Sequence, residues 1–117
     1  MSIQKYLKIA CFCLPFASFS SKLEAQVVYK TDFPKDANVK VYVTSYQKEA
    51  DVVVFKTPFI HNADGNNGLW YFTPYSGEAN KKICYTLAKD NADLIVFWTT
   101  KKEDAGWLNK KKKYLMR

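Results

Sequence analysis

A short motif recurs along the chain, and its period constrains what the chain can fold into. An alanine ends each copy and is followed by Asp or Asn in five copies and by Gly in the sixth, and successive alanines are 13, 13, 16, 13 and 13 residues apart. These alanines are Ala37, Ala50, Ala63, Ala79, Ala92 and Ala105. Six residues before each alanine lies a threonine: Thr31, Thr44, Thr57, Thr73, Thr86 and Thr99. Because a fixed period indicates a repeat architecture, we expect each copy to supply one unit to a shared core.

The residues ahead of each threonine predict a β-strand. In the second copy, Val39, Val41 and Val43 alternate with other residues along an extended segment, while Tyr42 and Thr44 point to its other side. β-branched and aromatic residues favour strands over helices. A 13-residue unit accommodates about six residues in a strand and the rest in a turn or irregular return. The sequence therefore predicts an all-β fold, built from six strand-turn repeats in one compact domain.

One irregularity interrupts the period. The segment Gly65-Asn66-Asn67-Gly68 accounts for the spacing of 16, and Asn-Gly pairs tolerate the left-handed backbone that tight turns require. This insertion separates two halves of three units each, residues 27–64 and 69–106, which suggests a pseudo-two-fold relation between them.

The repeated alanines, Asp or Asn residues and threonines are expected to serve folding. An alanine between larger residues indicates a close backbone approach. The Asp or Asn after it is expected to bond nearby backbone N–H groups and to fix a turn before the next strand. The threonine hydroxyls are expected to bond one another across neighbouring strands.

Ligand-binding alternatives exist for two of these sets. Oxygen atoms of the Asp and Asn residues could ring a calcium ion, but a spacing of 13 does not match a loop whose ligands alternate along one segment. The threonines could form an ice- or crystal-binding face, for which one hydroxyl per unit is sparse. The Asp and Asn residues are Asn38, Asp51, Asp64, Asn80 and Asp93.

Residues 1–25 are typical of a secretory signal peptide. Lys5 and Lys8 form its basic start, an apolar run follows from Ile9 to Ser20, and Ala25 ends a plausible cleavage site. This run is too short for a hydrocarbon core, which needs about 20 residues. We therefore expect export to the periplasm or beyond, with cleavage near Ala25 and a mature chain of residues 26–117 without a transmembrane span. A lipid anchor through Cys11 or Cys13 fits less well, since almost no apolar run precedes either cysteine.

Charge is distributed unevenly along the expected mature chain. Residues 26–106 hold ten basic and ten acidic side chains, whereas residues 107–117 hold five basic side chains and no acidic one. The net charge of +7 for the whole chain therefore reflects a basic C-terminal tail on a neutral body. Such a distribution does not indicate a specific nucleic-acid-binding face.

Cys84 is the only cysteine after residue 25, so the mature chain can form no internal disulfide. A cysteine hydrolase would need Cys84 as a thiolate with His61 as its base. Cys84 occupies a position that holds Tyr or Phe in the other five copies, which favours a buried side chain. His61 lies in a polar return segment without partners. We therefore predict no catalysis and no cofactor, and keep a Cys84-dependent enzyme as the alternative.

Aromatic residues and the C-terminal lysines are the remaining binding candidates. Phe33, Tyr46, Phe59 and Tyr75 lie in the return segments. If exposed together with the tryptophans Trp70, Trp98 or Trp107, they would stack on sugar rings or hold a partner; otherwise they pack in the core of a small domain. The lysine run is either a solvated tail or a contact for envelope polysaccharide or anionic lipid. The candidate binding residues are Trp70, Tyr75, Trp107, Lys110, Lys111, Lys112 and Lys113.

Two stretches of the sequence resemble a known family. Units of the form VYVT…EAD…VVFKT and the ending ADLIVFWTTKKEDAGWLNKKKKYL resemble the septoil knot domains, small bacterial proteins without a known activity, over nearly all of 27–115. The resemblance implies a compact all-β domain whose backbone follows a seven-crossing torus knot, and it implies no catalytic or binding residues. We therefore expect an exported, non-catalytic binding or structural module at the cell envelope, with glycan or anionic-polymer binding as the more specific alternative.

Overall fold

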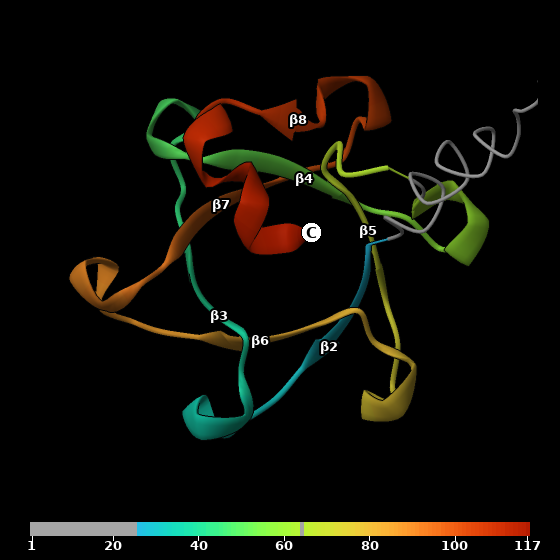
Figure 1. Cartoon of the computed structure of the whole chain (residues 1–117). Helices are drawn as coiled ribbons and strands as arrows, with labels where there is room; N and C mark the ends of the chain where they lie inside the picture. Colours follow the sequence, from blue (N-terminus) through green and yellow to red (C-terminus); the bar gives the residue numbers. More distant parts are fainter. Residues whose placement is uncertain (1–25, 64) are drawn as a thin grey trace, which may run out of the picture.

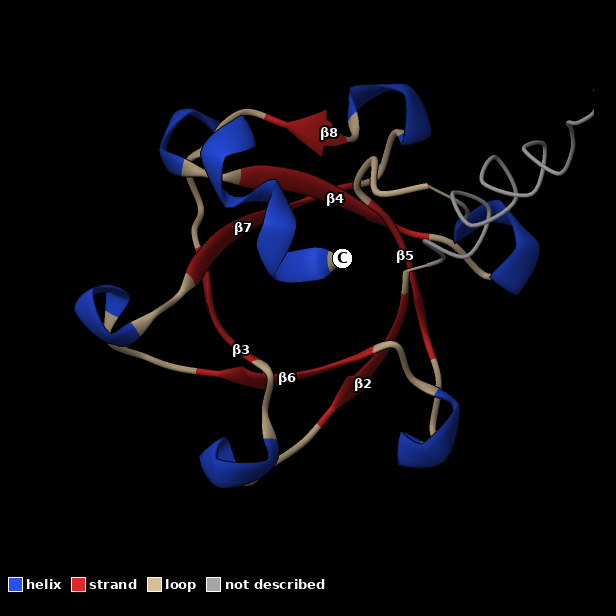
Figure 2. Ribbon diagram, in the orientation of Figure 1, coloured by secondary structure: helices blue, strands red, loops and turns tan. Residues whose placement is uncertain are grey.

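The structure, a computed structural model, describes residues 26–63 and 65–117, which form a barrel of short strands surrounded by 3₁₀ helices (Figures 1 and 2). The strands are β2 (Val27–Lys30), β3 (Val39–Val43), β4 (Val52–Lys56), β5 (Leu69–Phe72), β6 (Lys81–Tyr85), β7 (Leu94–Thr99) and β8 (Gly106–Trp107). The 3₁₀ helices are η3 (Pro34–Asp36), η4 (Gln47–Glu49), η5 (Ile60–Ala63), η6 (Ser76–Glu78), η7 (Lys89–Asn91), η8 (Lys102–Asp104) and η9 (Lys110–Met116). The predicted all-β fold of six strand-turn repeats is confirmed. No helix within this part of the chain is both long and apolar enough to cross a membrane.

Neighbouring strands in the barrel come from opposite halves of the chain. Their order is β5-β2-β6-β3-β7-β4-β8, and a further pairing of β4 with β5 closes the six longer strands into a barrel. From β2 to β4, and again from β5 to β8, each strand lies two places further along this order than the strand before it in the sequence, whereas β4 and β5, where the two laps meet, pair directly. The chain therefore circles the barrel twice, and the second lap fills the gaps left by the first. The two halves that flank the Gly65–Gly68 insertion correspond to these two laps.

The direction of the strands follows from the return segments. The 3₁₀ helices η3 to η8 lie outside the barrel (Figure 2), and each carries the chain from the end of one strand to the start of the next. Consequently the longer strands all run parallel, as in the pairs β2–β6, β3–β7 and β4–β7. Only the short β8 pairs antiparallel, with β4.

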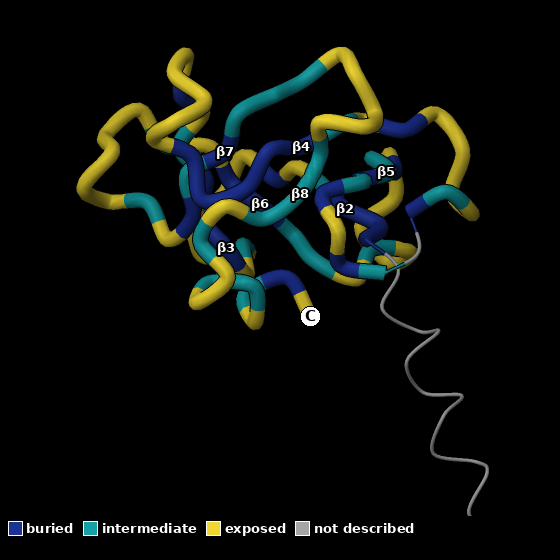
Figure 3. Tube along the Cα trace, turned by 90° about the horizontal axis from the view of Figure 1, so that it is seen from above, coloured by how far each residue is buried: buried dark blue, intermediate teal, exposed yellow. Residues whose placement is uncertain are grey.

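The barrel interior is built from one position of the repeat, nine residues before each alanine. All six side chains at this position have zero exposed surface: Val28, Val41, Val54, Trp70, Ile83 and Val96. Figure 3 shows this buried belt between exposed return segments. Full burial of such a side chain contributes about 1.5–3 kcal/mol to stability. The expectation that every copy supplies one extended segment to a shared interior is confirmed.

The predicted ladder of threonine hydroxyls across strands is wrong. Each threonine Oγ1 instead accepts a hydrogen bond from the backbone N–H two residues later, at 3.1–3.3 Å. This happens at all six positions because each threonine lies where its strand ends and the return begins: Thr99 is the last residue of β7, and the other five directly follow their strands. The short bond fixes the turn into the 3₁₀ helix.

The four described Asp and Asn residues do bond backbone N–H groups, but on the neighbouring strand rather than in their own turn, so the predicted turn-fixing role is wrong. Asn38 donates its backbone N–H to the carbonyl of Lys82 at 2.7 Å, and its Oδ1 accepts the backbone N–H of Lys82 at 2.8 Å. Asp51 pairs in the same way with Ile95, Asn80 with Val27, and Asp93 with Lys40. The partners are 44 or 53 residues apart. Each pair therefore joins one lap of the chain to the other.

The alanines explain why these side chains are free to reach across. The backbone N–H of Ala37, Ala50, Ala79, Ala92 and Ala105 closes the preceding 3₁₀ turn on a carbonyl three residues earlier. This backbone hydrogen bond closes the turn without a side-chain bond from the following Asp or Asn. Ala50 and Ala63 are buried and the other four are partly buried, as expected for a position with little room.

The C-terminal tail is part of the fold. Helix η9 lies across one end of the barrel, and the C-terminus lies near the barrel axis in Figure 1. Met116 is fully buried in the core, and its carbonyl accepts a 2.7 Å hydrogen bond from Gln26 Nε2. The side-chain amide of Asn66 donates to the Lys113 carbonyl at 2.9 Å. The lysine run is therefore not a free tail: Lys110 and Lys111 are exposed, but the run lies in η9, and Leu115 and Met116 behind it pack on the core.

Asp51 anchors this tail. Its carboxylate accepts hydrogen bonds from the Ile95 N–H at 2.8 Å and from Asn109 Nδ2 at 3.2 Å, and it forms an ion pair with Lys112 at 3.2 Å. Its carbonyl accepts the backbone N–H groups of Leu108 and Asn109, both at 2.9 Å. The Asp51 side chain is only 10% exposed, so these bonds form largely out of water.

Replacing Asp51 by alanine is expected to lower the free energy of unfolding by about 3 kcal/mol, because it leaves the partly buried donors of Ile95, Asn109 and Lys112 without this acceptor. The matched control is Asp93→Ala, which removes one exposed hydrogen bond, to Lys40, and is expected to cost about 1 kcal/mol. Urea unfolding followed by circular dichroism measures both. Equal losses in the two variants would contradict the role assigned to Asp51.

Gly68 and Gly77 form a second matched pair. Gly68 has φ +87°, and a Cβ there would lie 2.5 Å from the Val53 carbonyl oxygen and 2.8 Å from the Gly106 nitrogen. A Cβ at Gly77 would meet no atom within 4 Å. We expect Gly68→Ala to lower the free energy of unfolding by about 2 kcal/mol or more and Gly77→Ala to change it by less than about 0.5 kcal/mol. Thermal denaturation of the two variants tests this difference.

Candidate binding surface

The aromatic residues of four return segments are exposed. They immediately precede the 3₁₀ helices η3, η4, η5 and η6, two positions after the threonine. Their exposed fractions are 67% for Phe33, 68% for Tyr46, 57% for Phe59 and 64% for Tyr75. Of the two readings that the sequence left open, packing in the core is therefore wrong for these residues. We call this set the rim aromatics.

Two of the tryptophans considered as binding residues have structural positions instead. Trp70 has no exposed surface, because it belongs to the interior position of its repeat. Trp107 is half-buried in β8, and its Nε1 donates to the Asn66 carbonyl at 2.9 Å and to Asn66 Oδ1 at 3.2 Å. These bonds hold the Gly65–Gly68 insertion against β8. Of the three aromatic candidates, only Tyr75 is freely exposed.

Lys110, Lys111, Lys112 and Lys113 lie in η9, at the end of the barrel where the parallel strands begin. The hydrogen bonds of this segment show its position: they involve Gln26, Asp51 and Asn66, which all precede the first residue of a strand. The ammonium group of Lys112 forms the ion pair with Asp51 described above. The aromatics and lysines predicted as one binding set therefore do not all come together.

Cys84 and His61 occupy different environments. Cys84 is 7% exposed in β6, and its thiol contacts the Tyr85 carbonyl at 3.7 Å. His61 is exposed in η5, where its ring stacks on Phe59 at a centroid distance of 6.0 Å. Among the described residues, no group of three or more His, Cys, Asp or Glu side chains could hold a metal ion. Asp64, one member of the considered calcium ring, lies outside the described residues.

The other end of the barrel, where the parallel strands finish, carries a ring of side chains that we call the carboxyl mouth. These residues lie seven positions before the repeat alanine, on the same side of each strand as the interior residues. They are Lys30, Val43, Lys56, Phe72, Tyr85 and Trp98. Phe72 and Trp98 pack against the core, whereas Val43 and Tyr85 are each 38% exposed. The carboxyl mouth is thus a surface of mixed aromatic and cationic character.

Three residues of the carboxyl mouth form a compact cluster. Lys56 Nζ lies 4.3 Å from the ring centroid of Trp98 and 5.2 Å from that of Phe72. The Phe72 and Trp98 rings meet edge to face, with their centroids 5.9 Å apart. The buried Trp70 ring packs against both, with centroid distances of 6.2 Å to Phe72 and 6.0 Å to Trp98. The buried tryptophan thereby fixes the platform on which the ammonium group lies.

A hollow of about 450 Å³ opens beside this cluster. It is lined by Phe55, Lys56, Trp98, Thr99 and Thr100. Phe55 and Thr99 are direct partners in the register of β4 and β7, so the hollow lies over the seam between these strands at their carboxyl ends. Aromatic walls, a cation and hydroxyl groups meet there, which is the composition of a small-ligand site.

Lys30 provides a contrast within the same mouth. Its Nζ lies 5.9 Å from the Tyr85 ring centroid and forms an ion pair with Asp32 at 3.3 Å. Burial raises the pKa of Tyr85, so its hydroxyl remains protonated at neutral pH and is available as a donor. Asp32 already compensates the charge of Lys30.

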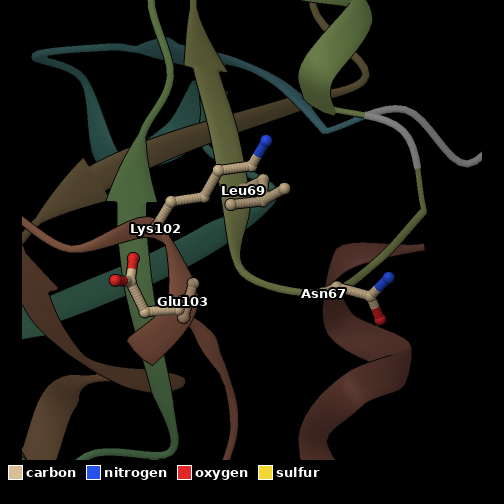
Figure 4. A pocket seen from close by; sticks show the side chains of 5 residues that line it. Asn67, Leu69, Lys102 and Glu103 are labelled. Atoms are coloured by element: carbon tan, nitrogen blue, oxygen red, sulfur yellow. The ribbon is translucent and has the colours of Figure 1, made fainter.

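Further hollows lie between return segments. One of about 620 Å³ is lined by Ser45, Tyr46, Gln47, Lys48, Phe97 and Leu108. Another, of about 390 Å³, lies between the Gly65–Gly68 insertion and η8 and is shown in Figure 4, where the Lys102 side chain extends past Leu69 and Asn67 points away. Both borders of this second hollow are exposed loops, and Lys102 and Glu103 carry opposite charges. The first hollow places one rim aromatic, Tyr46, beside the apolar Phe97 and Leu108.

Sequence reasoning missed Lys56 and Phe72 as parts of a site. The position seven residues before the alanine holds Lys, Val, Lys, Phe, Tyr and Trp in the six copies, so it shows no conserved type along the repeat. The alternation of side chains along a strand places this position on the interior side. That alternation is the one feature of the sequence that could have identified Lys56 and Phe72.

Comparison with known proteins supports the fold. No curated protein matched the chain, and no solved structure did. The model of one family, the 7(1) septoil knot domain, matches residues 25–108. The two-lap winding described above agrees with the knotted all-β path that the sequence resemblance implied. The chain belongs to the family of 7(1) septoil knot domains.

Proposed function

We propose that this protein is an exported, non-catalytic binding module of the cell envelope, and that its ligand is a glycan. The observation that carries the proposal is the exposure of the rim aromatics. Aromatic side chains exposed at one equivalent position in four copies provide a repeated set of contacts for a partner. Aromatic rings stack well on the apolar faces of sugars.

The arrangement of the rim aromatics suits a repeating ligand. They lie on successive return segments outside a closed barrel, whose shape the inter-lap bonds hold fixed. Several weak contacts on a rigid support raise the overall affinity for a polymer whose spacing matches theirs. Polysaccharides offer such a repeated contact.

Removing the rim aromatics is expected to abolish glycan binding. In a glycan array, protein obtained by expressing the full chain should bind one or more polysaccharides, and the variant Phe33→Ala/Tyr46→Ala/Phe59→Ala/Tyr75→Ala should bind at least about tenfold more weakly, since each stacking contact contributes around 1 kcal/mol. Leu87→Ala is the matched control, because Leu87 is an apolar return residue with 99% exposure. Absence of binding by the unmodified protein to any glycan would refute the proposed function.

Export is tested separately. Expression of the full chain in a bacterium is expected to yield an extracytoplasmic protein that begins at Gln26, as read by N-terminal sequencing. Leu14→Arg places a charge in the apolar run from Ile9 to Ser20 and should keep the protein in the cytoplasm with its N-terminus intact. Retention of the unmodified chain in the cytoplasm would contradict export without bearing on glycan binding.

A further inference from the structure

We infer that the hollow beside Lys56 binds the carboxylate of an acidic sugar, so that the preferred glycan of this domain contains uronic acid residues. This inference rests on the proposed function and specifies its ligand. It concerns the carboxyl mouth, a surface distinct from the rim aromatics.

Lys56 carries a positive charge that no acidic side chain of the described residues balances. Its ammonium group contacts the Trp98 and Phe72 rings at 4.3 and 5.2 Å, and no carboxylate within residues 26–63 or 65–117 forms an ion pair with it. Lys30, at the same repeat position, has Asp32 at 3.3 Å. A cation held on an aromatic platform without a counter-charge favours an anionic group beside it.

The surroundings of Lys56 form a hollow. The hollow of about 450 Å³ combines Lys56 with the aromatic walls Phe55 and Trp98 and with the hydroxyl-bearing Thr99 and Thr100. Its volume lies in the range of small-ligand sites. A pyranose ring placed against the aromatic walls would direct its polar edge toward the threonines.

The anion that fits both the aromatic walls and Lys56 is a sugar carboxylate. In a uronic acid the carboxylate is attached directly to the sugar ring, so one ligand unit reaches both the aromatic walls and the ammonium group. An anionic lipid surface instead requires a cluster of several basic residues on one face, and the carboxyl mouth offers one unpaired lysine. The basic cluster Lys110–Lys113 lies at the opposite end of the barrel, where it would serve a membrane independently of this hollow.

The test compares an acidic oligosaccharide with its neutral form. Protein obtained by expressing the full chain is titrated with oligogalacturonate and with the methyl ester of the same oligosaccharide, and binding is followed by calorimetry. We expect the acid to bind at least about tenfold more tightly than the ester, and this preference to weaken as NaCl is raised. Lys56→Gln should remove the preference, whereas Lys30→Gln should keep it within about twofold because Lys30 does not line this hollow.

The outcomes separate the inference from the proposed function. Equal binding of acid and ester, or an unchanged preference in Lys56→Gln, overturns the inference while glycan binding stands. Failure of oligogalacturonate to bind when other glycans bind also overturns it. Binding to vesicles of anionic phospholipid that is lost in Lys56→Gln, without binding to the acid, would assign the hollow to a membrane and reject the sugar. Because Lys56 is exposed, circular dichroism should show both variants folded.

Discussion

The structure depends on hydrogen bonds that join one lap of the chain to the other. Every strand before the Gly65–Gly68 insertion pairs only with strands that follow it. At four of these seams an Asp or Asn exchanges two hydrogen bonds with a single residue of the other lap, through its backbone N–H and its side-chain oxygen. These side chains supply an acceptor where a strand begins and the regular ladder has none. Without them the backbone N–H groups of Val27, Lys40, Lys82 and Ile95 would lose this acceptor, and the two laps would be joined more weakly at these four seams.

The unit of this fold could be predicted from the sequence, but the assembly of the units could not. The interior position, from Val28 to Val96, follows from period-two alternation and a fixed repeat, because both reflect local geometry. The threonine and Asp or Asn roles were misassigned because the sequence does not show which strands are neighbours. A ladder between successive threonines requires successive strands to be adjacent, whereas here they lie two places apart. Met116 was overlooked because one apolar residue behind four lysines has no periodic pattern to mark it.

The two ends of the barrel have different chemistry, and this follows from its parallel strands. At the end where strands begin, η9 and Met116 complete the core, and Asp51 binds the tail through Asn109 and Lys112. At the end where strands finish, no segment of residues 26–63 or 65–117 provides such a cover, so the last inward-facing residues of the strands are closer to solvent. Trp98 and Phe72 then shield the core from above, and Lys56 shields them in turn. The surface at this end is therefore largely apolar, because Phe72 and Trp98 also pack against the core, and its positive charge comes from Lys56, which lies outside the core. The candidate site residues therefore contact both the core and the solvent, so their residue types vary from copy to copy and the periodicity does not mark them.

The interleaved laps have a consequence for biosynthesis. When a ribosome has produced the chain up to β4, none of the three finished strands has a partner, because every strand that pairs with them follows the Gly65–Gly68 insertion. β4 meets the nearby β5, with Phe55 opposite Leu69, whereas the bonds that join the two laps at the strand starts span 44 or 53 residues. Pairing over such separations slows folding relative to folds built from local contacts. The last residues to be made, in η9, then fill the end of the barrel. A nascent or truncated polypeptide that stops at the midpoint is thus left with open strand edges and no domain of its own to form.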